Sequence, residues 1–174
     1  MNLVEDFDNL DKVSYALMGI YWDISDNYRG PCDFASGLFQ FIETDEWKKL
    51  EDKLSALTDQ VNSIIDEITG KLNEDITIQK EDADTINGSM KYFALSYESI
   101  HMKNWWFGMH KMDLNERAKL KGYFDKFKDK TVLINKVLTE KKDTLNIMSV
   151  KEAFESNMKD LENDPEFMSI IKDK

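Results

Sequence analysis

The chain has 174 residues, of which 41% are hydrophobic and 33% are charged, and its net charge is −11 at pH 7. A chain of this length and apolar content can bury a core of its own, which argues against an intrinsically disordered protein. Its longest apolar run, residues 15–22, is far shorter than the roughly 18 residues that a membrane span requires, and the N-terminus has no signal-peptide pattern. We therefore expect a single domain over residues 1–174 that works in the cytoplasm.

Glycine and proline are rare in this sequence, with seven and two residues respectively. Because these two residue types end strands and form tight turns, a chain with so few of them favours long helices. The single cysteine, Cys32, excludes an internal disulfide, and we interpret it as a small buried hydrophobic residue rather than a catalytic thiol. An all-α protein is the resulting expectation.

The first predicted helix covers residues 9–28. Its apolar residues recur three or four positions apart, as expected of one helix face, and they are Leu10, Val13, Leu17, Ile20 and Ile24. The sequence Arg29-Gly30-Pro31 would end this helix. A short helix is expected next, over residues 34–42.

The second long helix is predicted over residues 45–72. Spacings of three and four residues connect its apolar positions, which are Trp47, Leu50, Leu54, Leu57, Val61, Ile64 and Ile68. Thr44 is placed to cap the start of this helix, and Gly70 lies near its end. The apolar alternation at residues 76–78 is long enough only for a loop or a strand fragment.

The third long helix is predicted over residues 82–107. Its first stripe contains Ile86, Met90, Phe93, Tyr97 and Ile100, and a second stripe contains Leu95, Met102, Trp106 and Met109. A helix with two apolar stripes is expected to pack between other helices. We therefore assign Met102, Trp106 and Phe107 to the core and place the end of the helix at Gly108.

The fourth long helix follows Asp113, which together with Glu116 resembles a capping box. Its apolar stripe contains Leu120, Phe124, Phe127, Thr131, Ile134 and Leu138. Two later start signals are a capping box at residues 149–152 and an N-cap residue before proline in Asp164-Pro165. These signals predict two short terminal helices.

Four amphipathic helices of similar length can bury their stripes only against one another. We therefore predict an antiparallel bundle of about four long helices, with short connecting and terminal helices. A long extended coiled coil is the alternative, but links interrupt each stripe after about three to four heptads.

Charge is distributed unevenly along the sequence. Residues 1–46 have a net charge of −8, whereas residues 111–146 have a net charge of +4. We interpret the first segment as an anionic surface that resembles the phosphate array of a nucleic acid, and the second as a helix partly paired with acidic neighbours. The predicted acidic partner-binding residues are Glu5, Asp6, Asp8, Asp11, Asp23, Asp26 and Asp33. Trp22 and Trp105 are the predicted aromatic anchors of that surface.

These features favour a non-catalytic inhibitor, without a cofactor, that occupies the basic surface of a partner protein. Two classes of protein work in this way: phage anti-defence inhibitors, of the anti-CRISPR or anti-restriction type, and toxin-immunity proteins. We expect a nucleic-acid-targeting defence enzyme as the partner, because toxin immunity requires the additional assumption that the toxin is basic.

Two alternatives involve metal and nucleic acid. Glu98 and His101 are one turn apart on a helix, as in the Glu-x-x-His pairs of four-helix di-iron enzymes, but the chain has no second such pair. A metal-dependent bundle enzyme would use these two residues. Residues 111–142 form a basic helix with aromatic residues nearby, a combination found in single-strand binding proteins, although the acidic chain as a whole repels nucleic acid.

Overall fold

The computed structural model of this chain describes residues 2–27, 44–109 and 114–172. These residues form helices and contain no strand, which confirms the predicted all-α fold. The helices are α1 (Leu3–Asn27), α2 (Thr44–Leu72), α3 (Lys80–Met109), α4 (Leu114–Leu145), α5 (Val150–Glu162) and α6 (Pro165–Lys172). None of these helices is both long enough and apolar enough to cross a membrane. The predicted helix at residues 34–42, the stop at residues 29–31 and the cap at Asp113 lie outside the described residues.

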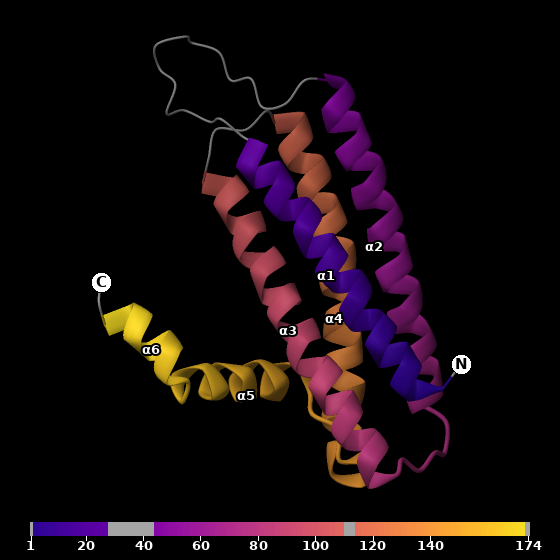
Figure 1. The fold of residues 1–174 in the computed structure, drawn as a ribbon. Coiled ribbons are helices and arrows are strands. Elements are labelled where there is room, and N and C mark those ends of the chain that lie inside the picture. Colours follow the sequence, from indigo (N-terminus) through magenta and orange to yellow (C-terminus); the bar gives the residue numbers. More distant parts are fainter. Residues whose placement is uncertain (1, 28–43, 110–113, 173–174) are drawn as a thin grey trace.

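Helices α1 to α4 lie side by side and form a bundle (Figure 1). Consecutive long helices run in opposite directions, as an antiparallel bundle requires. Their order in space differs from their order in sequence, because α1 packs against α2 and α3, and α4 packs against the same two helices from the opposite corner. As a result, α1 and α3 are neighbours that run in the same direction.

Two side-chain contacts fix this parallel pairing of α1 with α3. The indole Nε1–H of Trp22 donates to the Ser99 hydroxyl at 2.9 Å, and the Lys103 ammonium donates to the Ser25 hydroxyl at 3.0 Å. Both contacts join the end of α1 to the second half of α3. Positions closer to the C-terminus of α1 therefore contact positions closer to the C-terminus of α3, as in a parallel pair of helices.

Ion pairs join the basic helix α4 to α2. The Lys119 ammonium lies 3.5 Å from a Glu51 carboxylate oxygen, and the Lys130 ammonium lies 2.5 Å from an Asp66 carboxylate oxygen. These contacts confirm that part of the basic helix pairs with acidic neighbours. Because the side chains are partly exposed, each pair stabilises the fold by no more than about 1 kcal/mol.

The buried side of α2 keeps one line of its predicted stripe and lacks the other. Leu54, Val61 and Ile68 are buried as predicted, but Ile64 is only partly buried and its neighbour Ile65 is buried instead. Along the helix, the residue four positions after each of Leu54, Val61 and Ile68 is buried, rather than the residue three positions after it. Residues at both spacings lie on the same side of a helix, so the spacing alone does not show which flank faces the core.

The assignment of Met102 to the core is wrong, because its side chain is 70% exposed. Phe107 is buried as predicted, and Trp106 packs against the core from its edge. The physical reason is that the neighbouring helices cover the surface of α3 unequally. Helices α1 and α4 cover one side of α3, whereas α5 reaches its first half, where the Asn157 amide donates to the Lys91 carbonyl at 3.3 Å.

Helix α1 begins at Leu3, earlier than the predicted residue 9. The Asn2 side chain caps the helix, since its oxygen accepts a hydrogen bond from the Glu5 amide at 2.9 Å. The buried Phe7 extends the apolar stripe into this first part of the helix. The earlier start places Glu5 in the first turn of α1.

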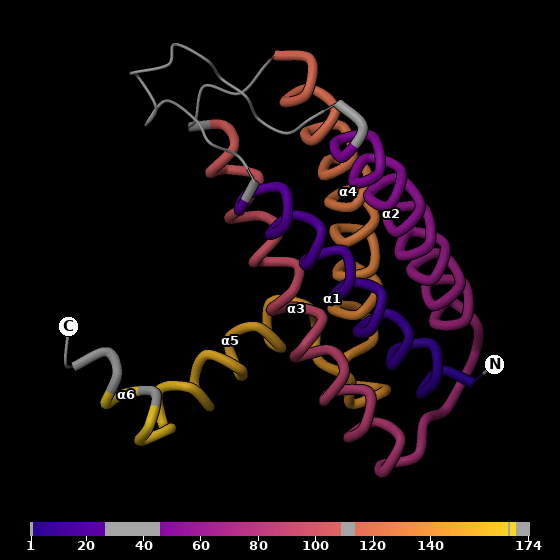
Figure 2. Tube along the Cα trace, turned by 45° about the horizontal axis from the view of Figure 1, so that its top comes forward, coloured from indigo at the N-terminus to yellow at the C-terminus, as the bar shows by residue number. Residues whose placement is uncertain are grey.

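The two predicted terminal helices are confirmed as α5 and α6. The Ser149 hydroxyl accepts from the Glu152 amide at 3.2 Å at the start of α5, and the Asp164 carboxylate accepts from the Glu166 amide at 2.9 Å at the start of α6. Helix α5 packs against α3 and α4, and α6 packs against α5. Together they project from the side of the bundle as an arm (Figures 1 and 2).

Candidate partner-binding surface

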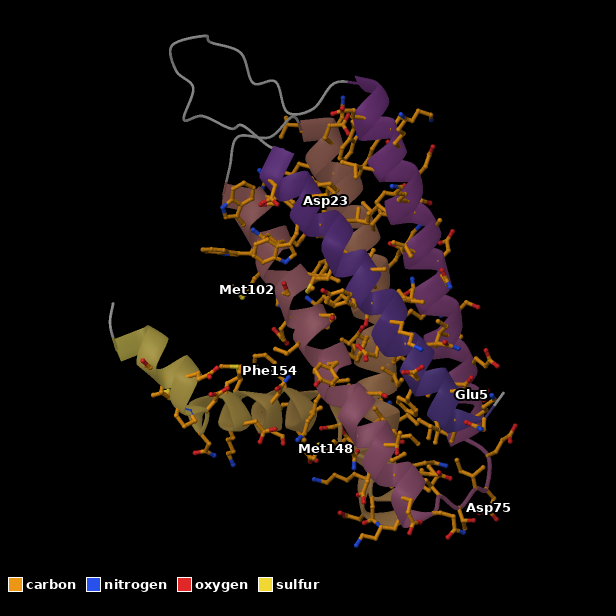
Figure 3. The ribbon with its side chains drawn as sticks, viewed as in Figure 1. Glu5, Asp23, Asp75, Met102, Met148 and Phe154 are labelled. Carbon is orange, nitrogen blue, oxygen red and sulfur yellow. The ribbon has the colours of Figure 1, made fainter. Side chains whose placement is uncertain are left out.

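The predicted acidic residues of α1 fall into two groups at opposite ends of the bundle. Glu5 lies near the start of α1, and Asp23 lies near its end (Figure 3). Asp26 is exposed one turn beyond Asp23. At 1.5 Å per residue, Glu5 and Asp23 are about 27 Å apart along the helix axis. The acids of α1 therefore form no continuous ridge, and Asp33 lies outside the described residues.

Asp6 does not belong to an exposed anionic surface, which corrects its prediction as a partner-binding residue. Its side chain is 2% exposed and lies 2.6 Å from the Lys71 ammonium, which also lies 3.4 Å from Glu67. The hydrogen bond to Asp6 raises the pKa of Lys71. This contact ties the start of α1 to the end of α2, so Asp6 has a structural role.

Asp8 and Asp11 are both half-buried, and Asp8 also pairs with a nearby cation. The Asp8 carboxylate is 2.6 Å from the Lys12 ammonium, one helical turn away. Burial, and then the nearby Asp8 charge, raise the pKa of Asp11. Glu5 is consequently the most exposed and least neutralised member of the predicted group at this end.

The fold adds acids from other segments to the end where Glu5 lies. The α2–α3 connection and the start of α3 lie at this end, and Asp75 is seen there with Glu5 in Figure 3. We name as the acidic end the exposed residues Glu5, Glu67, Glu74, Asp75, Glu81, Asp82 and Asp84. Of these seven residues, the sequence predicts only Glu5. Five of the other six lie in the run at residues 74–84, which contains five acids and one lysine and was the signal that could have found them.

A pocket of about 510 Å³ opens within the acidic end. Its apolar lining comes from Leu3, Val4, Ile76, Ile78 and Ile86. Its charged lining comes from Lys71, Glu74 and Asp82. The segment at residues 76–78, predicted as a loop or strand fragment, is a loop that packs part of its apolar surface against the core. The site thus combines an apolar floor with carboxylates.

The two predicted anchors, Trp22 and Trp105, lie on different sides of α3. Trp22 is 43% exposed and already engaged, since Ser99 accepts from its indole and the Lys103 ammonium lies 3.7 Å from its ring centroid. Trp105 is 65% exposed and lines a pocket on the side of α4 together with Arg117. The structure therefore does not join these tryptophans into one patch, and neither lies at the acidic end.

Glu98 and His101 form a pair, as their spacing predicts. The Nδ1 atom of His101 is 3.8 Å from a Glu98 carboxylate oxygen, and the imidazole stacks on Phe124 with ring centroids 5.4 Å apart. Within the described residues, no third histidine, cysteine or acid joins them in a group that could hold a metal ion. Cys32 and His110 lie outside those residues.

Comparison of the chain with protein families, with curated proteins and with solved structures finds no match.

Proposed function

We propose that this chain is a non-catalytic cytoplasmic binding protein that inhibits a partner by occupying the partner's basic surface with its acidic end. The partner class that we propose is a nucleic-acid-targeting defence enzyme, as for phage anti-defence proteins. One observation carries the proposal: acids from α1, α2 and α3 gather at one end of the bundle around an apolar pocket.

The arrangement of the acidic end supports both the encounter with a partner and the retention of that partner. Carboxylates that gather on one surface create a field that attracts a basic cleft and speeds encounter, as nucleic-acid phosphates do. Screening by salt weakens this attraction. The apolar floor of Ile76 and Ile78 supplies surface that a partner side chain can bury, which slows dissociation. Electrostatic encounter and apolar retention thus come from one surface.

The Asp6–Lys71 pair makes this end rigid before a partner arrives. It joins the first turn of α1, which carries Glu5, to the last turn of α2, and the Glu74 amide just beyond α2 donates to the Lys71 carbonyl at 3.2 Å. A surface that is ordered in the free protein loses less conformational entropy on binding. We therefore expect binding without a large rearrangement of the bundle.

The experiment compares two triple variants of the full chain. The first, Glu5→Lys, Glu74→Lys and Asp75→Lys, reverses charge at the acidic end. The matched control, Asp52→Lys, Asp59→Lys and Asp129→Lys, changes net charge by the same amount at exposed positions elsewhere. Each protein is used to capture partners from a lysate of the native host, after circular dichroism has shown equal helix content.

We expect the wild type and the control to capture the same protein and the acidic-end variant to lose it. The captured enzyme should fail to shift labelled nucleic acid when the wild type is present. Equal capture by both triple variants would show that the acidic end is not the binding surface. Rescue of cells from one specific toxin, without any effect on nucleic-acid binding, would assign the protein to the toxin-immunity class.

A further inference from the structure

A second pocket, at the opposite end of the bundle from the acidic end, has a different chemistry. It lies between the end of α3 and the start of α4 and has a volume of about 360 Å³. Its lining residues are Asn104, Trp105, Phe107, Gly108, Arg117 and Lys121. We name it the Trp105 pocket.

Among the described residues, the lining of the Trp105 pocket has two cations and no carboxylate, although the chain has a net charge of −11. The pocket at the acidic end includes Glu74 and Asp82, and the pocket between α1 and α3 includes Asp11. A third pocket, between α3, α4 and α5, includes Glu98 and Glu155. The Trp105 pocket is therefore built for a group with negative charge.

Arg117 is the cation best placed to receive that group. It is exposed, and it has no hydrogen bond or ion pair with another residue in the described part of the chain. Lys121 is also exposed but shares its charge with Asp125, whose carboxylate lies 2.7 Å away. A guanidinium presents a planar fork of donors that matches a phosphate.

Trp105 supplies the second element of recognition, an exposed aromatic ring next to the cation. Its neighbour Phe107 is buried and forms part of the floor, where its ring lies 6.4 Å from that of Tyr21. The pocket therefore has a fixed apolar base and one free ring on its rim. Exposed tryptophans of this kind stack on nucleobases in single-strand binding proteins.

We propose that the Trp105 pocket binds one nucleotide unit, with the base stacked on Trp105 and the phosphate oxygens accepting hydrogen bonds from Arg117 and Lys121. A volume near 360 Å³ is in the range of small-ligand sites. A free nucleotide and a single strand share this chemistry, and the experiment separates them. The site is independent of the proposed function, because it lies at the other end of the bundle.

The test uses the full chain and four probes: adenosine 5′-monophosphate, adenosine, inorganic phosphate and a short oligoadenylate. Calorimetry gives each affinity, and NMR of the Trp105 indole and the Gly108 amide locates the binding. The variants are Trp105→Ala and Arg117→Gln. Met102→Ala and Lys126→Gln are matched controls, since both residues are exposed on the same two helices and neither lines the pocket.

We expect a dissociation constant below about 1 mM for the monophosphate or for the oligoadenylate. Trp105→Ala and Arg117→Gln should each weaken binding by about tenfold or more, because loss of one stacking contact has an effect of this size. Both controls should stay within about twofold. Binding of the monophosphate identifies a free nucleotide as a sufficient ligand, and binding of the oligoadenylate alone identifies a single strand.

Three results would overturn the proposal. The first is that neither nucleotide probe binds below about 1 mM. The second is that inorganic phosphate binds as tightly as both nucleotide probes, since the ring would then contribute nothing. The third is that Trp105→Ala binds as tightly as the wild type, or that ligand binding does not shift the Gly108 amide signal.

Discussion

The pockets at the two ends of the bundle differ in charge, although they belong to the same acidic protein. At one end, Glu74 and Asp82 line a pocket together with Ile76 and Ile78, and further exposed acids lie at the same end. At the other end, Arg117 and Lys121 line a pocket with Trp105, and no carboxylate from the described part of the chain lines it. Net charge is a property of the sequence, but the sign of the field at a given surface depends on which segments the fold brings together.

The two ends also differ in what holds them together. The acidic end depends on a nearly buried ion pair between Asp6 and Lys71, at 2.6 Å. The opposite end depends on aromatic packing, since the centroid of the Phe107 ring lies 6.4 Å from that of the Tyr21 ring and 5.5 Å from that of the Trp106 ring. Substitutions at the two ends should therefore lower stability for different physical reasons.

The largest loss of stability is expected from Phe107→Ala. This change removes a fully buried ring and leaves a cavity, so the free energy of unfolding should fall by about 3 to 5 kcal/mol. Urea unfolding monitored by circular dichroism measures the change. Trp105→Ala is the control, because the neighbouring side chain is mostly exposed and its removal should cost less than about 1 kcal/mol. Equal losses for the two variants would contradict the observed burial.

A smaller loss is expected from Lys71→Met at the acidic end. The change leaves the buried Asp6 carboxylate without its partner, and the free energy of unfolding should fall by about 2 to 4 kcal/mol. Lys12→Met removes an exposed ion pair of the same length, with Asp8, and should cost less than about 1 kcal/mol. Both values come from urea unfolding at neutral pH. A Lys71 variant as stable as the Lys12 variant would remove the structural role given to Asp6.

The smallest effect is expected from Asp11→Asn. Because the pKa of Asp11 is raised above its ordinary value of 3.8, the folded chain holds this proton more tightly than the unfolded chain does. Ionisation of Asp11 therefore opposes folding, and its contribution to stability falls as the pH rises from 3.8 through the raised pKa.

At neutral pH, Asp11→Asn should consequently be as stable as the wild type or more stable by less than about 0.5 kcal/mol, since solvent screens a half-exposed group. The difference in unfolding free energy from the wild type, measured from acid to neutral pH, should develop across this window and persist at neutral pH. Asp59→Asn, at an exposed position of α2, is the comparison. A marked loss of stability at neutral pH would mean that the Asp11 charge is favourable.

The fold was largely predictable because apolar spacing reports which side of a helix is buried. Periodicity could not show how much of α3 its neighbours cover, so Met102 was assigned to the core although it faces outward. The exposure of the acidic residues of α1 was only partly predictable, since Glu5 is exposed and Asp6 is buried. Asp6 and Lys71 are far apart in sequence, and only tertiary packing reveals their contact.

The acids at residues 74–84 were visible as a run, but their closeness to Glu5 depends on how α1 and α2 pair. The Trp105 pocket was predictable in composition, since an aromatic residue and a basic helix are both apparent in the sequence. Its location was not predictable, because Trp105 and Arg117 meet across the junction of two helices. Surfaces that combine several segments require the fold before their chemistry can be judged.

The salt dependence of binding to the captured partner tests most directly whether the acidic end makes the contact. The dissociation constant is measured for the wild type at about 50 mM and at about 500 mM salt, where the Debye length falls to a few ångströms. If the acidic end makes the contact, the affinity of the wild type should fall by about tenfold or more at high salt. The variant with reversed charge at Glu5, Glu74 and Asp75 should bind weakly at both salt concentrations. Equal affinity of the wild type at the two salt concentrations would contradict the account.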